Sequence, residues 1–120
     1  PEWIDFPREG NGWSYAYCRR QWTLVDKETL KYKFLNNFDR DMIHWVQKTW
    51  FLDSIPAQQL NMDESNKVIV FERNNYVFVF NFSPSNSIFD YKFRVPQRGP
   101  YQILLNTDAR NYGGHGRIDM

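Results

Sequence analysis

Three carboxylates near the start of the chain are the first side chains with catalytic potential. Glu2, Asp5 and Glu9 lie close together in a polar segment. Two carboxyl groups whose pKa values are held apart can do general acid and base work. The alternative is structural, because acids in a polar loop commonly pair with neighbouring cations such as Arg8. We expect the structural pairing, and therefore no catalytic pair in this segment.

Cysteine and histidine, which nucleophilic or metal chemistry would need, are scarce. The chain has one cysteine, Cys18, and two histidines, His44 and His115. This set is too small for a zinc site and permits no internal disulfide. Cys18 falls on the apolar side of an expected helix, where a thiol is usually buried and inert. His115 stands among glycines and is expected in a turn. We expect no metal and no cofactor.

Aromatic side chains offer a different chemistry, which is stacking on sugars or bases. Trp3, Trp13 and Tyr17 lie in or near an irregular segment, and flat rings of this kind can act as stacking platforms. Fifteen Lys and Arg against fourteen Asp and Glu leave a net charge of +1, which argues against phosphate neutralisation and so against a nucleic-acid partner. Neutral sugar is then the favoured ligand, with Trp3 and Trp13 as candidate substrate-binding residues. The alternative, that these rings pack against a neighbouring part of a larger protein, stays equally open.

Length and hydropathy restrict the setting in which these residues act. The 120 residues correspond to about one small domain. Apolar runs fall well short of the roughly 18 residues that a membrane span needs. We therefore expect a soluble, intracellular protein with no membrane partner.

The first half of the chain is expected to be a loop followed by two helices. Residues 1–13 hold two prolines and two glycines without a sustained period and predict an irregular loop. Ser14 is a suitable N-cap for a short helix over residues 14–22, and Asp26 for a longer helix that ends near Lys48. The longer helix has one apolar stripe, formed by Leu30, Phe34, Phe38, Met42, Trp45 and Val46.

After Pro56 the hydrophobic period changes from that of a helix to that of a strand. Residues 67–72 and 76–82 flank a short polar turn and predict a hairpin. Further strands are expected at residues 58–62, 91–95 and 101–105, which makes an antiparallel sheet of about five strands. Strands this apolar need cover on both faces. One amphipathic helix supplies little of it, so the pattern indicates an α+β fragment of a larger protein, or an oligomer.

Several motifs in order along the chain resemble 1,4-α-glucan (glycogen or starch) branching enzymes of the α-amylase superfamily. The resemblance rests on residues 1–11 (PEWIDFPREGN), 15–22 (YAYCRRQW), 30–40 (LKYKFLNNFDR), 70–73 (VFER), 78–85 (FVFNFSPS), 90–91 (DY), 106–109 (NTDA) and 112–115 (YGGH). One departure is Arg94, where the family pattern has a small residue. The resemblance implies a C-terminal fragment of such an enzyme.

The resemblance also implies how the chain divides into domains. Residues 1–52 would be the tail of a catalytic (β/α)8 barrel, namely the loop after its last strand and the closing helices. Residues 53–120 would be the first strands of an incomplete C-terminal all-β sandwich domain. The opening loop would then face the active site, because loops at that end of a barrel line it.

The implied activity belongs to the parent enzyme. A branching enzyme cleaves α-1,4 linkages of glycogen or amylose and transfers the chain to a glucan 6-hydroxyl, which makes α-1,6 branches during glycogen biosynthesis. The family's catalytic acids precede the motif that opens this chain, so no residue here matches them and Glu2 and Asp5 take no catalytic role. The fragment is expected to be inactive, cytoplasmic and prone to self-association. The alternatives are part of an α-amylase-type hydrolase and a free-standing carbohydrate-binding module.

Overall fold

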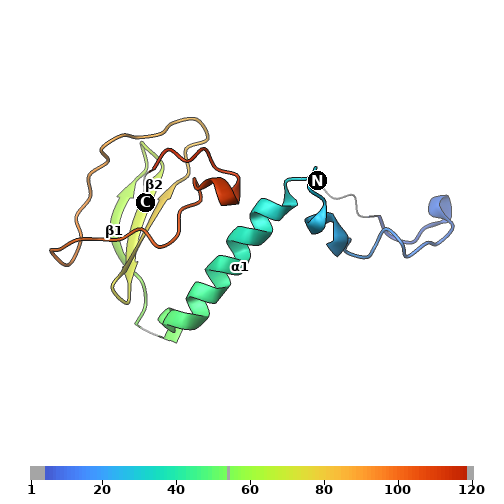
Figure 1. Ribbon diagram of the computed structural model, residues 1–120, viewed down its shortest axis with the longest axis horizontal. Coiled ribbons are helices and arrows are strands. Elements are labelled where there is room, and N and C mark those ends of the chain that lie inside the picture. Colours follow the sequence, from blue (N-terminus) through green and yellow to red (C-terminus); the bar gives the residue numbers. More distant parts are fainter. Residues whose placement is uncertain (1–4, 54, 119–120) are drawn as a thin grey trace. The chain divides into compact units, whose positions relative to one another are not determined.

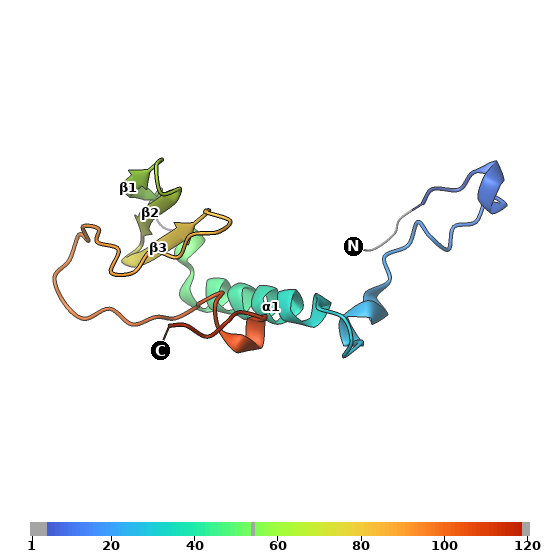
Figure 2. The same ribbon diagram turned by 90° about the horizontal axis from the view of Figure 1, so that it is seen from above.

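A computed structural model describes residues 5–53 and 55–118 of the chain. These residues form two compact units. The first unit comprises residues 5–40 and 106–118, and the second comprises residues 41–53 and 55–105. Helix α1 (Tyr32–Thr49) contributes its first half to one unit and its second half to the other. It is unbroken in both views (Figures 1 and 2).

Helix α1 ends where the sequence predicts and begins later than predicted. At its C-terminus the Thr49 hydroxyl donates to the carbonyl of Trp45 (2.9 Å). Trp50 follows with φ of 52°, and its N–H donates to the carbonyl of Val46, so a left-handed residue closes the last turn. The predicted cap at Asp26 is wrong, because Asp26 is instead the last residue of the 3-10 helix η2 (Trp22–Asp26).

The short helix expected over residues 14–22 is also wrong. The Ser14 hydroxyl accepts a hydrogen bond from the Ala16 N–H (3.2 Å), and the Cys18 N–H donates to the carbonyl of Tyr15 (3.2 Å). Serine side chains that bond the nearby backbone in this way compete with helix formation. The segment therefore makes turns between the 3-10 helices η1 (Glu9–Asn11) and η2.

The second unit contains a three-stranded antiparallel sheet of order β1 (Gln58–Asp63), β2 (Val68–Arg73) and β3 (Tyr76–Asn81). The predicted strand at 58–62 and the predicted hairpin are confirmed. Arg73 pairs with Tyr76 across a two-residue turn, in which Asn74 and Asn75 have φ of 54° and 64°. Two consecutive positive φ values match the twist of a hairpin, and asparagine tolerates them better than most residues.

The two faces of the sheet differ in composition. On one face of β2 lie Val68, Val70 and Glu72, which are its buried residues, with Val70 fully buried. The Glu72 carboxylate accepts a hydrogen bond from the Asn75 N–H (2.6 Å) in the turn, which satisfies the acid beside the apolar residues. The opposite face of β2 carries Phe71.

Aromatic rings cover that opposite face. Phe71 stacks on Phe78 with ring centroids 4.7 Å apart and on Phe80 at 5.9 Å. Trp45 of α1 meets the rings of Tyr76 and Phe78 edge to face, at 4.8 and 6.0 Å. Edge-to-face and offset stacked pairs are the favoured geometries for aromatic rings, so the second half of α1 gives the sheet part of its cover.

The strands predicted at residues 91–95 and 101–105 are wrong. Within the described residues the sheet has three strands and not about five, and residues 82–109 contain no strand. Pro96 directly follows the first of these segments and Pro100 directly precedes the second, and a proline has no N–H with which to extend a ladder. The segment contacts the sheet through side chains instead, since the Tyr91 hydroxyl donates to the Asp63 carboxylate (2.9 Å) and accepts from the Asn61 amide (2.7 Å).

The short 3-10 helices η3 (Phe51–Asp53) and η4 (Arg110–Tyr112) complete the element order. No helix among the described residues has the length and apolar character needed to cross a bilayer.

Candidate functional site

The opening loop is organised around the Asp5 carboxylate. The Arg8 side chain donates to it through Nε (3.2 Å to each oxygen) and Nη2 (3.0 Å), and the Asn11 amide donates to it at 3.3 Å. The Arg8 guanidinium, followed by Asn11, holds the pKa of Asp5 below its ordinary value. An acid that is ionised and occupied in this way is a poor proton donor, and the expected structural pairing with Arg8 is found.

Asn11 continues the network into the backbone. Its side-chain oxygen accepts from the Arg8 N–H (3.0 Å), and its amide nitrogen donates to the carbonyl of Phe6 (2.9 Å). The carbonyl of Arg8 accepts from the N–H groups of Asn11 (3.1 Å) and Trp13 (2.9 Å). The loop thus satisfies its backbone with its own side chains, as a segment without ladder partners requires.

Trp13 is held in an unusual conformation at the end of this network. Its φ is 57°, directly after Gly12 at 62°, and its side chain is 66% exposed. A left-handed conformation costs a residue other than glycine about 1–2 kcal/mol. Backbone strain of this kind can indicate a functional residue when the surrounding contacts maintain it. At Trp13 the strained backbone presents an exposed indole ring.

The other sequence candidates fall in different places. Trp3 and Glu2 lie outside the described residues. Tyr17 is half exposed, and Cys18 is a half-buried free thiol within a turn. His44 is exposed on α1. No group of three or more His, Cys, Asp or Glu within residues 5–53 and 55–118 is placed to hold a metal ion.

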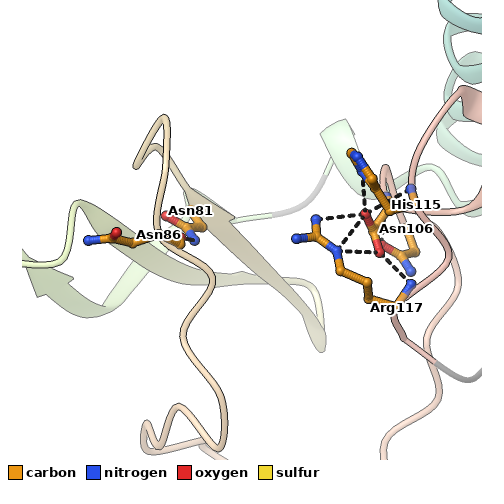
Figure 3. Close-up of polar contacts among 6 residues, drawn as sticks. Asn81, Asn86, Asn106, His115 and Arg117 are labelled. Atoms are coloured by element: carbon orange, nitrogen blue, oxygen red, sulfur yellow. Dashed lines mark hydrogen bonds and ion pairs between the residues drawn. The ribbon is translucent and has the colours of Figure 1, made fainter.

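A second polar cluster, around Asp108, has no counterpart in the predicted site. The carboxylate accepts from the backbone N–H groups of His115 (3.2 Å) and Arg117 (2.7 Å). It also accepts from Arg117 Nη2 (2.8 Å), and Figure 3 shows Arg117 and His115 meeting at this carboxylate. Asn106 lies beside them and accepts from the Asp108 N–H (2.9 Å). The side-chain and backbone hydrogen bonds from Arg117 hold the pKa of Asp108 far below its ordinary value.

Glycines let the chain close tightly around this cluster. The Gly114 N–H donates to the carbonyl of Ala109 (3.1 Å), and a Cβ at Gly114 would collide with the Asp108 backbone. Gly113 has φ of 79° and faces the Phe34 ring so closely that a side chain would need the ring to move. These close approaches explain the glycines without a phosphate-binding role.

The same loop is attached to the first half of α1. The Asn37 amide donates to the carbonyl of Asn111 (3.3 Å), and the Phe38 and Tyr112 rings meet edge to face at 5.4 Å. His115 is exposed and lies just after the turn that ends at Gly113, and not in a turn as expected. Its backbone N–H donates to the Asp108 carboxylate, and its Nδ1 lies 3.8 Å from the same group. The paired Asp108 and Arg117 were missed because they lie nine residues apart with only the glycines between them as a signal.

Asn81, at the end of β3, orders the loop that follows the hairpin. Its side-chain nitrogen donates to the carbonyl of Asn86 (2.8 Å), and its oxygen accepts from the Ser83 N–H (2.9 Å).

Comparison with known proteins places these features in a family. Residues 60–119 match the family described as "Alpha amylase, C-terminal all-beta domain". The chain is 55% identical over 117 residues to the 1,4-alpha-glucan-branching enzyme of Solanum tuberosum, covering 98% of this chain and 14% of that protein. It is 54% identical to the enzyme of the same name from Debaryomyces hansenii and 50% identical to that of Felis catus, in each case over 119 residues, 99% of this chain and 17% of the relative. The chain thus spans about a sixth of the length of these relatives.

Proposed function

Since the chain belongs to the family of the alpha amylase C-terminal all-beta domain, we propose that it is the C-terminal part of an enzyme that branches α-1,4-glucan. The observation that carries this proposal is the identity of 50–55% over nearly the whole chain to the three proteins named 1,4-alpha-glucan-branching enzyme. The three-stranded antiparallel sheet of the second unit is compatible with an all-β domain of this kind.

The reaction is a retaining transglycosylation. A carboxylate attacks the anomeric carbon of an α-1,4 linkage while a second acid protonates the departing sugar oxygen. A glucan 6-hydroxyl then displaces the enzyme carboxylate from the glycosyl intermediate and forms the α-1,6 branch. We assign these acids to parts of the enzyme outside this chain, as the resemblance to branching enzymes implies. Within the chain, Asp5 is occupied by Arg8 and Asn11 and Asp108 by Arg117.

Residues 1–52 are proposed to complete the catalytic (β/α)8 barrel, with α1 as a closing helix, and residues 53–120 to begin the all-β domain. In this arrangement the opening loop lies at the face of the barrel where the substrate binds. Trp13, exposed on that loop, is proposed to stack on a glucose ring of the α-glucan, together with Trp3. A sugar presents its C–H groups to an aromatic face, and the indole offers the largest such face.

Amylose is the substrate that tests the activity. The whole protein that carries this chain is incubated with amylose, and the iodine absorption spectrum, the reducing ends and the α-1,6 linkages are followed. A branching enzyme shifts the iodine spectrum and makes α-1,6 linkages with few new reducing ends. Accumulation of reducing ends without branches favours a hydrolase, and binding without turnover favours a carbohydrate-binding module. The 120 residues alone are expected to leave amylose unchanged, and turnover by them would place catalytic acids within this chain.

Two further properties are proposed for the chain in its setting. The first is a cytoplasmic location, whereas the Oryza sativa relative is named as a chloroplastic or amyloplastic enzyme. Fractionation of the source cells distinguishes the two. The second is self-association of the isolated chain, because Met62 and Phe80 on the sheet and Phe82 directly after β3 leave apolar surface exposed. Light scattering that gives the mass of one chain would contradict it.

A further inference from the structure

We propose that Asp5 is a positioning residue for the stacking platform formed by Trp13. The inference rests on the proposed function, in which Trp13 stacks on a neutral α-glucan. Asp5 does not touch the sugar in this proposal. It acts through Arg8 and Asn11, whose contacts maintain the backbone that presents the indole.

Trp13 needs such support because its conformation is not one that it adopts readily. With φ of 57° it lies in the left-handed region. Without supporting contacts, a tryptophan prefers an extended or right-handed helical backbone. The side chain is 66% exposed, so burial of the indole contributes little to keeping it there. The support must come from the backbone of the loop.

The contacts lead from Trp13 back to Asp5 in two steps. The Trp13 N–H donates to the Arg8 carbonyl at 2.9 Å, and the same carbonyl accepts from the Asn11 N–H. Arg8 and Asn11 are then joined by the bond from the Arg8 N–H to the Asn11 side chain (3.0 Å). The Asp5 carboxylate accepts from the side chains of both residues, at 3.0 Å from Arg8 Nη2 and 3.3 Å from Asn11 Nδ2. One carboxylate therefore restrains both residues that set the path of the chain into Trp13.

Asp5 also closes the loop at its other end. Its N–H donates to the carbonyl of Tyr17 at 3.2 Å, which ties a residue several positions ahead of the 3-10 helix η1 to a residue beyond Trp13. A side chain on a closed loop loses less freedom on binding than one on an open segment, and such preorganisation raises affinity.

The charge of the network fits a neutral ligand. Asp5 is ionised, because hydrogen bonds from Arg8 and Asn11 hold its pKa below the ordinary value, and Arg8 carries the compensating charge within the same loop. The pair is therefore internally neutralised, and the arginine is not available to take a phosphate as its main partner. An α-glucan, which has ring faces and no charge, is the ligand class that this platform suits.

A double-mutant cycle on the whole protein tests the proposal, with maltoheptaose as the probe. The Trp13→Ala change is expected to weaken maltoheptaose binding about fivefold, which is the size of one stacking contact. The Asp5→Ala change is expected to weaken it about threefold in the presence of Trp13. In the Trp13→Ala protein the same change should have no further effect, because Asp5 then has no platform to position. The Asp5→Glu change should restore part of the lost affinity.

A second variant and a matched control keep the test decisive if Asp5→Ala impairs folding. Asn11→Ala removes the other support while leaving the pair of Asp5 and Arg8 in place, and it should show the same dependence on Trp13. Trp50→Ala is the control, since Trp50 is also exposed (72%) and left-handed (φ of 52°) but lies outside the Asp5 loop. Its maltoheptaose affinity should be unchanged.

The outcomes separate the two proposals. Unchanged affinity in Trp13→Ala would overturn the stacking role itself, and the positioning role with it. Weaker binding in Trp13→Ala, combined with an equal loss from Asp5→Ala whether or not Trp13 is present, would leave the stacking role in place and overturn the positioning role of Asp5.

Discussion

The hairpin of β2 and β3 and the loop around Asp108 differ in what satisfies their backbone amides. In the hairpin, six residue pairs from Val68 with Asn81 to Arg73 with Tyr76 form an antiparallel ladder. Its side chains are then free to pack, which gives the fully buried Val70 and the stacked Phe71 and Phe78 rings.

Residues 108–117 form a loop that contains no strand, and one side chain takes the place of a ladder. The Asp108 carboxylate accepts from the N–H groups of His115 and Arg117, and the Asp108 carbonyl accepts from Gly116 (2.7 Å). The stability of the hairpin therefore depends on apolar contacts spread over many residues, whereas that of the loop depends mainly on one charge. Substitutions should therefore act differently in the two regions.

The largest effect is expected from Trp45→Ala, which removes two edge-to-face contacts from the sheet. We expect the hairpin to lose about 3 kcal/mol of stability, from buried aromatic area and ring contacts together. Hydrogen exchange of the β2 amides in the whole protein measures it. Trp50→Ala, which removes an exposed tryptophan close by in the chain, should change the same exchange by less than about 0.5 kcal/mol. Equal losses in the two variants would mean that Trp45 does not cover the sheet.

A smaller and local effect is expected from the charge of Asp108. Because the pKa of Asp108 in the folded protein lies below its ordinary value of 3.8, the carboxylate stabilises the loop above about pH 4. This stabilisation is lost progressively as the pH falls from the ordinary pKa to the lower, folded pKa. An NMR titration should therefore find Asp108 still ionised near pH 3, where a free aspartate is mostly protonated.

The Asp108→Asn variant supplies the matched control. Its loop amides at residues 115–117 should exchange faster at neutral pH, since the charged acceptor is gone, while the β2 amides remain protected. Faster exchange of the β2 amides as well would show that the stability of the hairpin depends on the Asp108 charge.

The smallest effect is expected at the hairpin turn. Asn75 has φ of 64°, and glycine is the preferred residue at this position of a two-residue turn. Asn75→Gly should stabilise the hairpin by about 0.5 kcal/mol. The change also removes the hydrogen bond from Gln97 to the Asn75 side chain (2.9 Å), and the loss of that bond reduces the gain. Chemical denaturation of the whole protein, followed at the hairpin, measures the change. A loss of stability would mean that the hydrogen bond from Gln97 stabilises the hairpin more than an exposed side-chain pair usually does.

Sequence patterns predicted the elements whose signal is local. The apolar runs of Val68 to Phe71 and of Val77 to Phe80 around a polar turn indicated the hairpin, and the structure confirms it. The resemblance to branching enzymes is likewise confirmed by the relatives, because it rests on the order of many residues. The division into domains near residues 52 and 53 stays a prediction.

The errors lie where local signals conflict. The apolar spacing of residues 14–22 suggested a helix, but Ser14 bonds to the backbone of its own turn. The alternation near Tyr91 suggested a strand, but this tyrosine uses its hydroxyl to reach Asn61 and Asp63. Whether the apolar spacing or the side-chain hydrogen bond decides the local structure depends on which residues lie nearby in space, and the sequence does not give these.

The family, the hairpin and the end of helix α1 could be predicted from the residues alone, because they depend on residue order and on spacing within a few turns of chain. Three contacts required the folded structure: Asp108 meets Arg117, Trp45 covers the sheet at Tyr76, and Asp5 holds the residues before Trp13. These contacts are set by the directions in which loops and side chains leave their elements. Such directions follow from backbone angles, like the positive φ of Trp13, that no periodicity in the sequence encodes.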